Sequence, residues 1–282
     1  MYTIELIVFL GSGFFMVKFL IEWYRPLIRM WPPGRGGLQK VVLQVLPPAA
    51  LGMILFTLRV LASFDVIGDF FYLLLYVLLG MAWIYFGLWL MTRLFDLSWL
   101  DDAIYRDNKA AMVTVCGGFL AITLIYAGAN IGDGPGWWCV IFAGGLGLLG
   151  WILLARLIDD IGGRVFERIT VGRDRGCGIR MGGYLLGSGI VLARASAGDW
   201  TSFSATVVEF AAGWPVLILA AACLVVEWLA GRPRRTDGPG GGAVAGSVCI
   251  GVLYIALGVV CVLLLPPLVE NPFYDVLWAV VL

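Results

Sequence analysis

Residues 101–160 read DDAIYRDNKAAMVTVCGGFLAITLIYAGANIGDGPGWWCVIFAGGLGLLGWILLARLIDD, and this stretch decides the fold. It contains a charged entry segment, an apolar run, a short acidic turn, a second apolar run and a charged exit. Each apolar run has about 20 residues, the length that an α-helix needs to cross a bilayer. The stretch therefore predicts a transmembrane helical hairpin.

The same plan recurs along the chain. Residues 104 and 117–120 (Ile, then Gly-Gly-Phe-Leu) reappear at one offset as residues 169 and 182–185 (Ile, then Gly-Gly-Tyr-Leu). The acidic turn Ile131-Gly132-Asp133 is followed by Ala197-Gly198-Asp199, and Ile67-Gly68-Asp69 forms a weaker upstream copy. An internal repeat of this kind predicts an architecture of stacked units. We expect one membrane domain over 1–282 with parallel hairpin units at about 43–95, 101–160 and 166–229.

Composition places the whole chain in the membrane. Of its 282 residues, 61% are hydrophobic and 13% are charged, and the mean hydropathy is +0.95. Soluble domains have about 25% charged residues. The formal net charge of +0 gives no reason to expect a nucleic-acid partner, so we expect the lipid bilayer and other protein subunits instead.

Metal and cofactor chemistry is not expected. The sequence has no histidine, which removes histidine general bases and histidine-ligated haem or zinc. The cysteines form no CxxC pair, and buried free cysteine behaves as a small apolar residue. We therefore expect no metal site and no cofactor.

Eight spans are predicted for an all-α, polytopic transmembrane bundle. The first, at 4–23, lacks the basic start and cleavage site of a signal peptide. Trp214-Pro215 predicts a kink in the seventh span, and Pro266-Pro267 ends the last. The other spans are expected at 43–62, 70–91, 111–129, 137–157, 179–195, 203–229 and 244–265.

Charge orients these spans. Basic residues gather in every second connection, with six arginines from 156 to 180. In the three intervening turns the charged residues are all acidic. The positive-inside rule places the basic connections in the cytoplasm and both termini outside. The first and last spans then run in opposite directions, so they are a candidate for a fourth hairpin split across the termini.

Glycine is expected to hold the spans together, because close backbone approach replaces the hydrophobic effect inside lipid. The glycines predicted to pack helices are Gly117, Gly118, Gly178, Gly182, Gly183 and Gly187, the last four in two GxxxG spacings. The same spacings fit either contacts within one chain or a seam between copies in a homo-oligomer.

Ionisable residues inside spans are candidates for function, because the bilayer makes them costly. Arg194 and Glu209 are predicted at similar depth near the outer side, as an ion pair or as a proton or ion site. Arg59 lies within reach of Asp65 or Asp69. We expect replacement of Glu209 to matter more than replacement of Glu227.

The polar segment before residue 109 suggests a helix start. Asp107 and Asn108 can cap the helix that follows through its free N–H groups. The second copy has Gly172-Arg173 at this place, so we do not expect the cap to be repeated. The carboxylates nearby have no phosphate-binding glycine motif around them, and no catalytic residue is expected.

The run DDAIYRDNKAA, followed by a glycine-rich helix and a short acidic turn, resembles the YjfL-like family of uncharacterised inner-membrane proteins. The resemblance covers about residues 97–230. Only the first copy carries the pattern Asp107, Asn108, Ala110, Ala111; the second has Gly172, Arg173, Arg175 and Gly176. The resemblance implies a bacterial inner-membrane location and repeated two-helix units, and it supplies no catalytic residues.

These observations favour a non-enzymatic structural or interaction subunit of a bacterial inner-membrane assembly. Two alternatives remain open. One is a small ion or proton channel or transporter that uses Arg194 and Glu209, and the other is a subunit that binds lipid or quinone in an apolar cleft.

Overall fold

A computed structural model describes residues 3–29, 31, 37–230, 241–265 and 268. The side chains of residues 64, 65 and 241–243, and the predicted stop at Pro266-Pro267, lie outside the described residues. All the elements of the described residues are helical, which confirms the all-α prediction. They are α1 (Thr3–Arg29), α2 (Gly37–Val60), α3 (Phe64–Gly68), α4 (Phe70–Phe95), η1 (Trp99–Tyr105), α5 (Lys109–Gly128), α6 (Trp137–Ile161), α7 (Val165–Thr170), α8 (Arg175–Ala195), α9 (Phe203–Phe210), η2 (Ala211–Gly213), α10 (Pro215–Ala230) and α11 (Gly241–Leu264).

The long helices have the dimensions of membrane spans. Seven of them in the described residues are long and apolar enough to cross a membrane. The segments α9–η2 and α10 together pass the same test but are bent by 44°, and counting them as one span gives the eight predicted. The bend lies at Trp214, directly before Pro215, because proline cannot donate the backbone hydrogen bond that continues a helix. The predicted kink is therefore confirmed.

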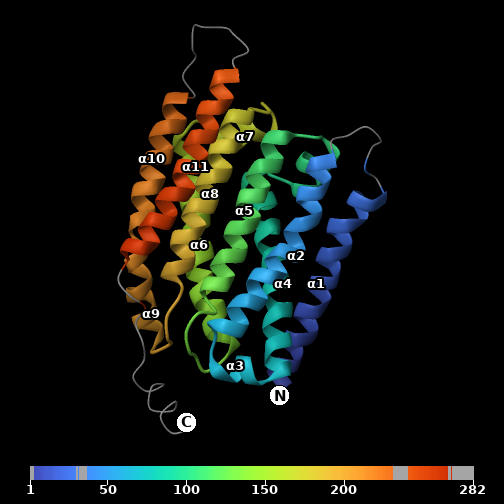
Figure 1. The fold of residues 1–282 in the computed structure, drawn as a ribbon, viewed down its shortest axis with the longest axis vertical. Coiled ribbons are helices and arrows are strands. Elements are labelled where there is room, and N and C mark those ends of the chain that lie inside the picture. Colours follow the sequence, from blue (N-terminus) through green and yellow to red (C-terminus); the bar gives the residue numbers. More distant parts are fainter. Residues whose placement is uncertain (1–2, 30, 32–36, 231–240, 266–267, 269–282) are drawn as a thin grey trace.

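The helices form two layers (Figure 1). In one layer α2 contacts α5, α5 contacts α8, and α8 contacts α11. In the other layer α1 contacts α4, α4 contacts α6, and α6 contacts α10. The two layers pack on each other through α4 and α6 against α5, and through α6 and α10 against α8. Each layer is thus a row of neighbouring helices, and over the described residues the two stacked rows have free edges and do not close into a ring.

The first and last spans lie at opposite edges of this row (Figure 1). Among the described residues α1 packs on α4, α2 and η1, whereas α11 packs on α8 and α10. The expected fourth hairpin between the first and last spans is therefore wrong. Opposite directions of two helices do not make them neighbours, since the glycine contacts of α11 are already made with α8.

Glycine brings α5, α8 and α11 into backbone contact. A Cβ at Gly117 would overlap the backbone of Gly182, and one at Gly178 would lie 2.6 Å from the Ala110 carbonyl oxygen. On the other side of α8, a Cβ at Gly183 or Gly187 would overlap backbone carbonyls of α11. Gly118 faces the other layer, where a Cβ would lie 2.6 Å from Met91 Cε. The central helix α8 thus contacts a neighbour on each side through a separate glycine pair.

One end of the bundle, here named the basic end, carries η1, α7 and the starts of α5 and α8 (Figure 1). Asn108 caps α5 by accepting from the Ala110 and Ala111 N–H groups, as predicted. Asp174 caps α8 in the same way by accepting from the Cys177 N–H, so the expectation that the cap is not repeated is wrong. The preceding residues Asp107 and Arg173 have φ of 52° and 53°, so the approach to the cap is also repeated.

The opposite end, here named the acidic end, joins three turns by backbone hydrogen bonds. The Gly132 N–H donates to the Leu61 carbonyl (3.1 Å), and the Gly198 N–H donates to the Ile131 carbonyl (3.0 Å). Gly132 and Gly198 have φ of 105° and 140°, a region that glycine adopts without strain. The first of the three hydrogen-bonded turns is therefore the turn at 61–62. Asp69, which belongs to the proposed upstream copy of the acidic turn, instead caps α4.

Candidate functional site

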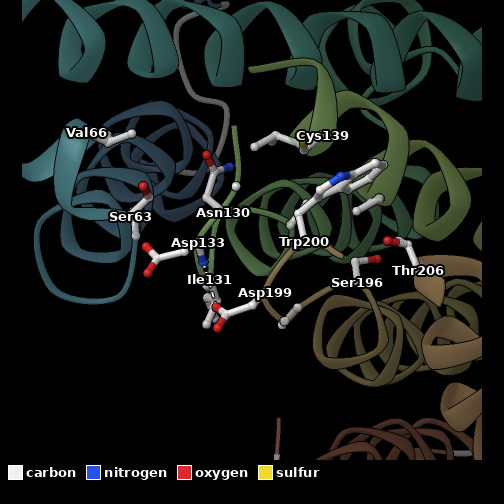
Figure 2. A pocket seen from close by; sticks show the side chains of 18 of the residues that line it. Ser63, Val66, Asn130, Ile131, Asp133, Cys139, Ser196, Asp199, Trp200 and Thr206 are labelled. Atoms are coloured by element: carbon white, nitrogen blue, oxygen red, sulfur yellow. Dashed lines mark hydrogen bonds between the residues drawn. The ribbon is translucent and has the colours of Figure 1, made fainter. Parts of the chain in front are cut away.

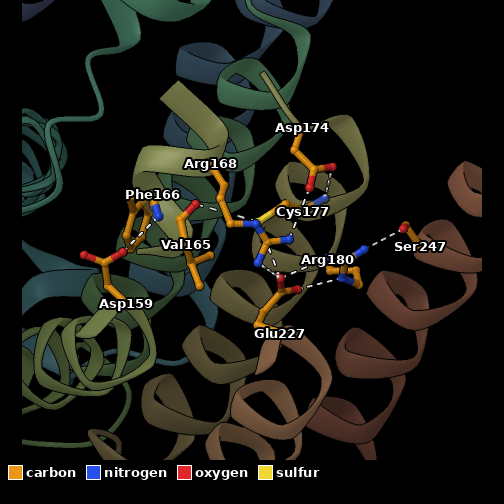
Figure 3. Close-up of polar contacts among 9 residues, drawn as sticks. All are labelled: Asp159, Val165, Phe166, Arg168, Asp174, Cys177, Arg180, Glu227 and Ser247. Carbon is orange, nitrogen blue, oxygen red and sulfur yellow. Dashed lines mark hydrogen bonds and ion pairs between the residues drawn. The ribbon is translucent and has the colours of Figure 1, made fainter. Parts of the chain in front are cut away.

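A buried carboxylate lies near the basic end, on α10. The side chain of Glu227 is 0% exposed and receives two hydrogen bonds from Arg180 of α8 (Figure 3). Arg180 Nε lies 2.6 Å from Glu227 Oε1, and Arg180 Nη2 lies 2.9 Å from Oε2. A bidentate arginine–carboxylate pair is among the strongest polar contacts that a protein forms. This pair fixes the register of α8 against α10.

Further groups complete the network around that pair. Arg168 of α7 donates to Glu227 Oε2 at 3.2 Å and to Asp174 Oδ2 at 3.1 Å. The Cys177 thiol lies 3.5 Å from Glu227 Oε2, and Arg180 Nη1 donates to the Ser247 hydroxyl of α11 at 2.8 Å. Figure 3 shows these side chains converging from four helices. The network therefore ties α7, α8, α10 and α11 together at one point.

The electrostatics of the network favour its charged form. At Asp174 burial acts to raise the pKa, but the Cys177 N–H and the Arg168 guanidinium outweigh it and hold that pKa below its ordinary value. At Arg168 burial acts to lower the pKa, but the negative groups around it outweigh that effect and raise it. Both groups therefore stay charged at neutral pH.

The sequence contains a signal for this network. By sequence, Arg180 belongs to a basic connection and Glu227 to the end of a span. Both residues stand about one or two turns inside helices that are joined as a hairpin, the same criterion that selected Arg194 and Glu209. With Glu227 fully buried and Glu209 only partly buried, the ranking of Glu209 above Glu227 is not supported.

A small polar pocket lies at the acidic end, between the three joined turns (Figure 2). Its cavity volume is about 40 Å³. The Asp133 N–H donates to Asp199 Oδ1 at 2.7 Å, and the Trp200 N–H donates to the Asp133 carbonyl at 2.7 Å. Glu209 also lines this pocket. Acidic side chains from two consecutive turns and from α9 therefore gather here.

The predicted Arg194–Glu209 ion pair is absent, although both residues are described. Arg194 lies in the last turn of α8, and the structure gives no ion pair between it and Glu209. The physical reason is the bend: α9 diverges by 44° from the axis of α10, so Glu209 does not lie where a straight span would place it. Glu209 instead faces the pocket that holds Asp133 and Asp199.

Of the predicted contact between Arg59 and Asp65, the structure describes the Arg59 side chain. Arg59 Nη1 donates to the Ile67 carbonyl at 3.3 Å, which ties the end of α2 to α3. The side chain of Asp65 lies outside the described residues, so its contact with Arg59 stays a prediction.

No family model, curated protein or solved structure matches the chain.

The chemistry available to the described residues is therefore read from the residues alone. They contain no group of three or more His, Cys, Asp or Glu side chains placed to hold a metal ion. The six cysteines are free. Within the described part of the chain, the charged side chains that are buried are Asp102, Arg180 and Glu227, and each is bonded to a protein partner. The arrangement can fix helices relative to one another.

Proposed function

We propose that this chain is a non-enzymatic helical scaffold that acts as an interaction subunit of a bacterial inner-membrane assembly. The proposal depends on how the buried charges are bonded. Asp102, Arg180 and Glu227 each form hydrogen bonds with neighbouring protein groups. Ionisable groups that bind or transport a substrate need a donor, an acceptor or a charge that is not already bonded to the protein, whereas groups that stabilise a structure do not. A rigid bundle with bonded charges suits a subunit that positions other proteins.

The surface available to a partner lies at the edges of the row. Only 11% of the most apolar window of α1 and 22% of that of α11 is buried, against 78% for α8. These edge helices offer apolar faces to lipid, to another subunit or to a second copy. The resemblance to the YjfL-like family supports an inner-membrane location, and the charge distribution supports a topology with the basic end in the cytoplasm and both termini outside.

We also infer that the GxxxG spacings drive the packing of the bundle. Gly178 and Gly182 face α5, and Gly183 and Gly187 face α11, at distances that leave no room for a side chain. Small residues permit this approach and gain van der Waals contact that lipid does not provide. Because both spacings are used inside the chain, an oligomer would need another seam.

The channel or transporter alternative has less support. Its proposed residues, Arg194 and Glu209, do not pair, and the pocket that Glu209 lines has a volume of about 40 Å³ at one end of the bundle. A transport pathway needs polar groups along the depth of the membrane. The buried hydroxyls of Thr123 and Ser188 are bonded to carbonyls within their own helices.

The lipid- or quinone-binding alternative has one observation in its favour. A groove of about 550 Å³ runs between α1 and α4, with walls that include Phe15, Trp83, Phe86 and Trp89. Aromatic walls of this kind suit the chain or the ring of an apolar ligand. This alternative is therefore kept as a second candidate function.

Purification of the full chain from its native membrane in mild detergent tests the proposal. A scaffold is expected to bring down one or more membrane proteins in a fixed ratio, and extraction of the same sample tests for quinone. Reconstituted liposomes are expected to show no proton or cation flux. Flux that is lost in Glu209→Gln would overturn the scaffold proposal in favour of transport, and a fixed molar amount of quinone without protein partners would favour the second candidate.

A further inference from the structure

A half-open cleft lies at the basic end, between the start of α8, the end of α10 and the start of α11. Its volume is about 600 Å³. The two helices that flank it, α10 and α11, contact each other less than each contacts α8. The cleft therefore opens on the outside of the bundle where two membrane helices diverge.

The walls of this cleft are apolar. Val226 and Leu229 line it from α10, and Val244 and Ile250 line it from α11. These side chains lie on helices with the length and hydropathy of membrane spans. An occupant must therefore carry an apolar part that continues from the cleft into the bilayer.

The floor of the cleft is polar, and its side chains are held in place by hydrogen bonds. Arg180 is 7% exposed, lines the cleft and donates from Nη1 to the Ser247 hydroxyl at 2.8 Å (Figure 3). A Cβ at Gly176 would lie 2.8 Å from that hydroxyl oxygen and 3.2 Å from Arg180 Nη1, so a larger residue at this position of the first turn of α8 would displace the Ser247 or Arg180 side chain. The position of the floor is thus fixed by packing as well as by hydrogen bonds.

The charge of the cleft is positive. Arg168, Arg175 and Arg180 line it, and the carboxylates that they face are Asp174 and the buried Glu227. Arg168 and Arg180 are bonded to those carboxylates. Arg175 is exposed, and the structure gives it no ion pair or hydrogen bond among the described residues. One arginine is therefore available for an anion at the rim.

We propose that this cleft binds an anionic phospholipid. The headgroup phosphate meets the Arg175 guanidinium at the rim, above the floor formed by the bonded Arg180 and Ser247 side chains, and an acyl chain lies along the apolar walls of α10 and α11. Arginine suits phosphate because its planar guanidinium offers several donors at once. A free inorganic phosphate would leave the apolar walls uncovered, so a lipid fits the whole cleft better. This inference does not depend on the scaffold proposal, because it concerns the lipid and not a protein partner.

Native mass spectrometry of the full chain, after removal of lipid in detergent, tests the proposal. Phosphatidylglycerol and phosphatidylcholine are added in turn, and the bound fraction of each is measured against concentration. We expect tighter retention of phosphatidylglycerol, and in Arg175→Gln a loss of about fivefold in its apparent affinity, as expected for one basic residue at a membrane surface. Val244→Trp, which fills the cleft without changing its charge, is expected to weaken both lipids.

Lys109→Gln is the matched control. Lys109 is the first residue of α5 after the cap Asn108, as Arg175 is the first residue of α8 after the cap Asp174, and Lys109 does not line the cleft. Its affinity for phosphatidylglycerol is expected to equal that of the unchanged protein. Equal retention of the two lipids, or equal effects of Arg175→Gln and Lys109→Gln, would overturn the proposal. Full displacement of phosphatidylglycerol by millimolar inorganic phosphate would overturn the lipid in favour of a free anion.

Discussion

The basic and acidic ends of the bundle contain the same pair of residue types on successive segments of the chain. At the basic end Arg180 and Glu227 lie 2.6 Å apart and are buried. At the acidic end Arg194 and Glu209 form no ion pair, and Glu209 lies beside a pocket with Asp133 and Asp199. Similar depth along two helices therefore predicts a side-chain contact only where both helices are continuous. Glu227 lies in α10, whereas Glu209 lies in α9, on the other side of the 44° bend between α9–η2 and α10.

The largest expected effect comes from breaking the buried pair. Glu227→Leu leaves Arg180 and Arg168 without their shared carboxylate, and removal of one partner of a buried ion pair costs about 3–5 kcal/mol. The measurement is the thermal unfolding midpoint of the purified protein in detergent. The double variant Arg180→Met, Glu227→Leu is expected to recover most of that loss, because both members of the buried pair are then replaced by apolar side chains and Arg168 keeps Asp174 as its partner.

The exposed pair Arg164–Glu167 provides the control for this experiment. Its side chains are 81% and 54% exposed, and an exposed ion pair contributes about 0–1 kcal/mol. Glu167→Gln should therefore change the midpoint very little. A Glu227→Leu protein as stable as Glu167→Gln would show that the buried pair contributes no more to stability than an exposed pair at the same end.

The next effect concerns the central helix. Gly187→Ala places a methyl group against the Tyr254 carbonyl, and because backbone cannot rotate away as a side chain can, the variant should lose about 1–3 kcal/mol. Gly145→Ala is the comparison, since a Cβ there meets nothing within 4 Å. That change should be neutral, or stabilising by up to about 1 kcal/mol from helix propensity. A destabilisation of equal size in both variants would contradict the close contact of α8 with α11.

A smaller effect is expected at the repeated cap. Asp174→Ala removes the cap of α8 and should cost about 1 kcal/mol, whereas Asp174→Asn keeps an acceptor and should cost less. Since the pKa of Asp174 is lowered in the fold, its charge contributes stability above the unfolded value of about 4, and this is lost as pH falls through the folded pKa. Unfolding midpoints measured from pH 7 down to pH 3 should fall less steeply in Asp174→Asn than in the unchanged protein.

The smallest effect is expected at Glu209. The structure gives its carboxylate no hydrogen bond or ion pair among the described residues, so Glu209→Gln should change the unfolding free energy by less than about 0.5 kcal/mol. The same unfolding measurement applies. A loss comparable to that of Glu227→Leu would restore the ranking that the sequence suggested.

The architecture was predictable because its signals are strong and local. A run of apolar residues long enough to cross a bilayer can be recognised without knowledge of its neighbours, and Pro215 removes a backbone donor from the span that contains it. The cap at Asn108 was predictable for the same reason, since it acts on the residues that follow it directly.

The adjacency of distant helices was not predictable in this way. Antiparallel direction made α1 and α11 candidate neighbours, but the glycine contacts between α8 and α11 decide the position of α11. The buried network was missed because Arg180 stands at the boundary between connection and span, where composition does not separate the two. The cap at Asp174 was missed because it lies one residue farther along than the offset of the glycines predicts.

The two-layered row has a consequence for how such a molecule can change in size. Each helix contacts its immediate neighbours, so stability is approximately a sum of unit and interface contributions, as in repeat proteins. A ring would fix the number of units, because every addition would have to reopen it. An unclosed row accepts an extra hairpin at either margin while leaving every existing interface as it was, which makes tandem duplication of a gene segment a tolerated route to longer descendants.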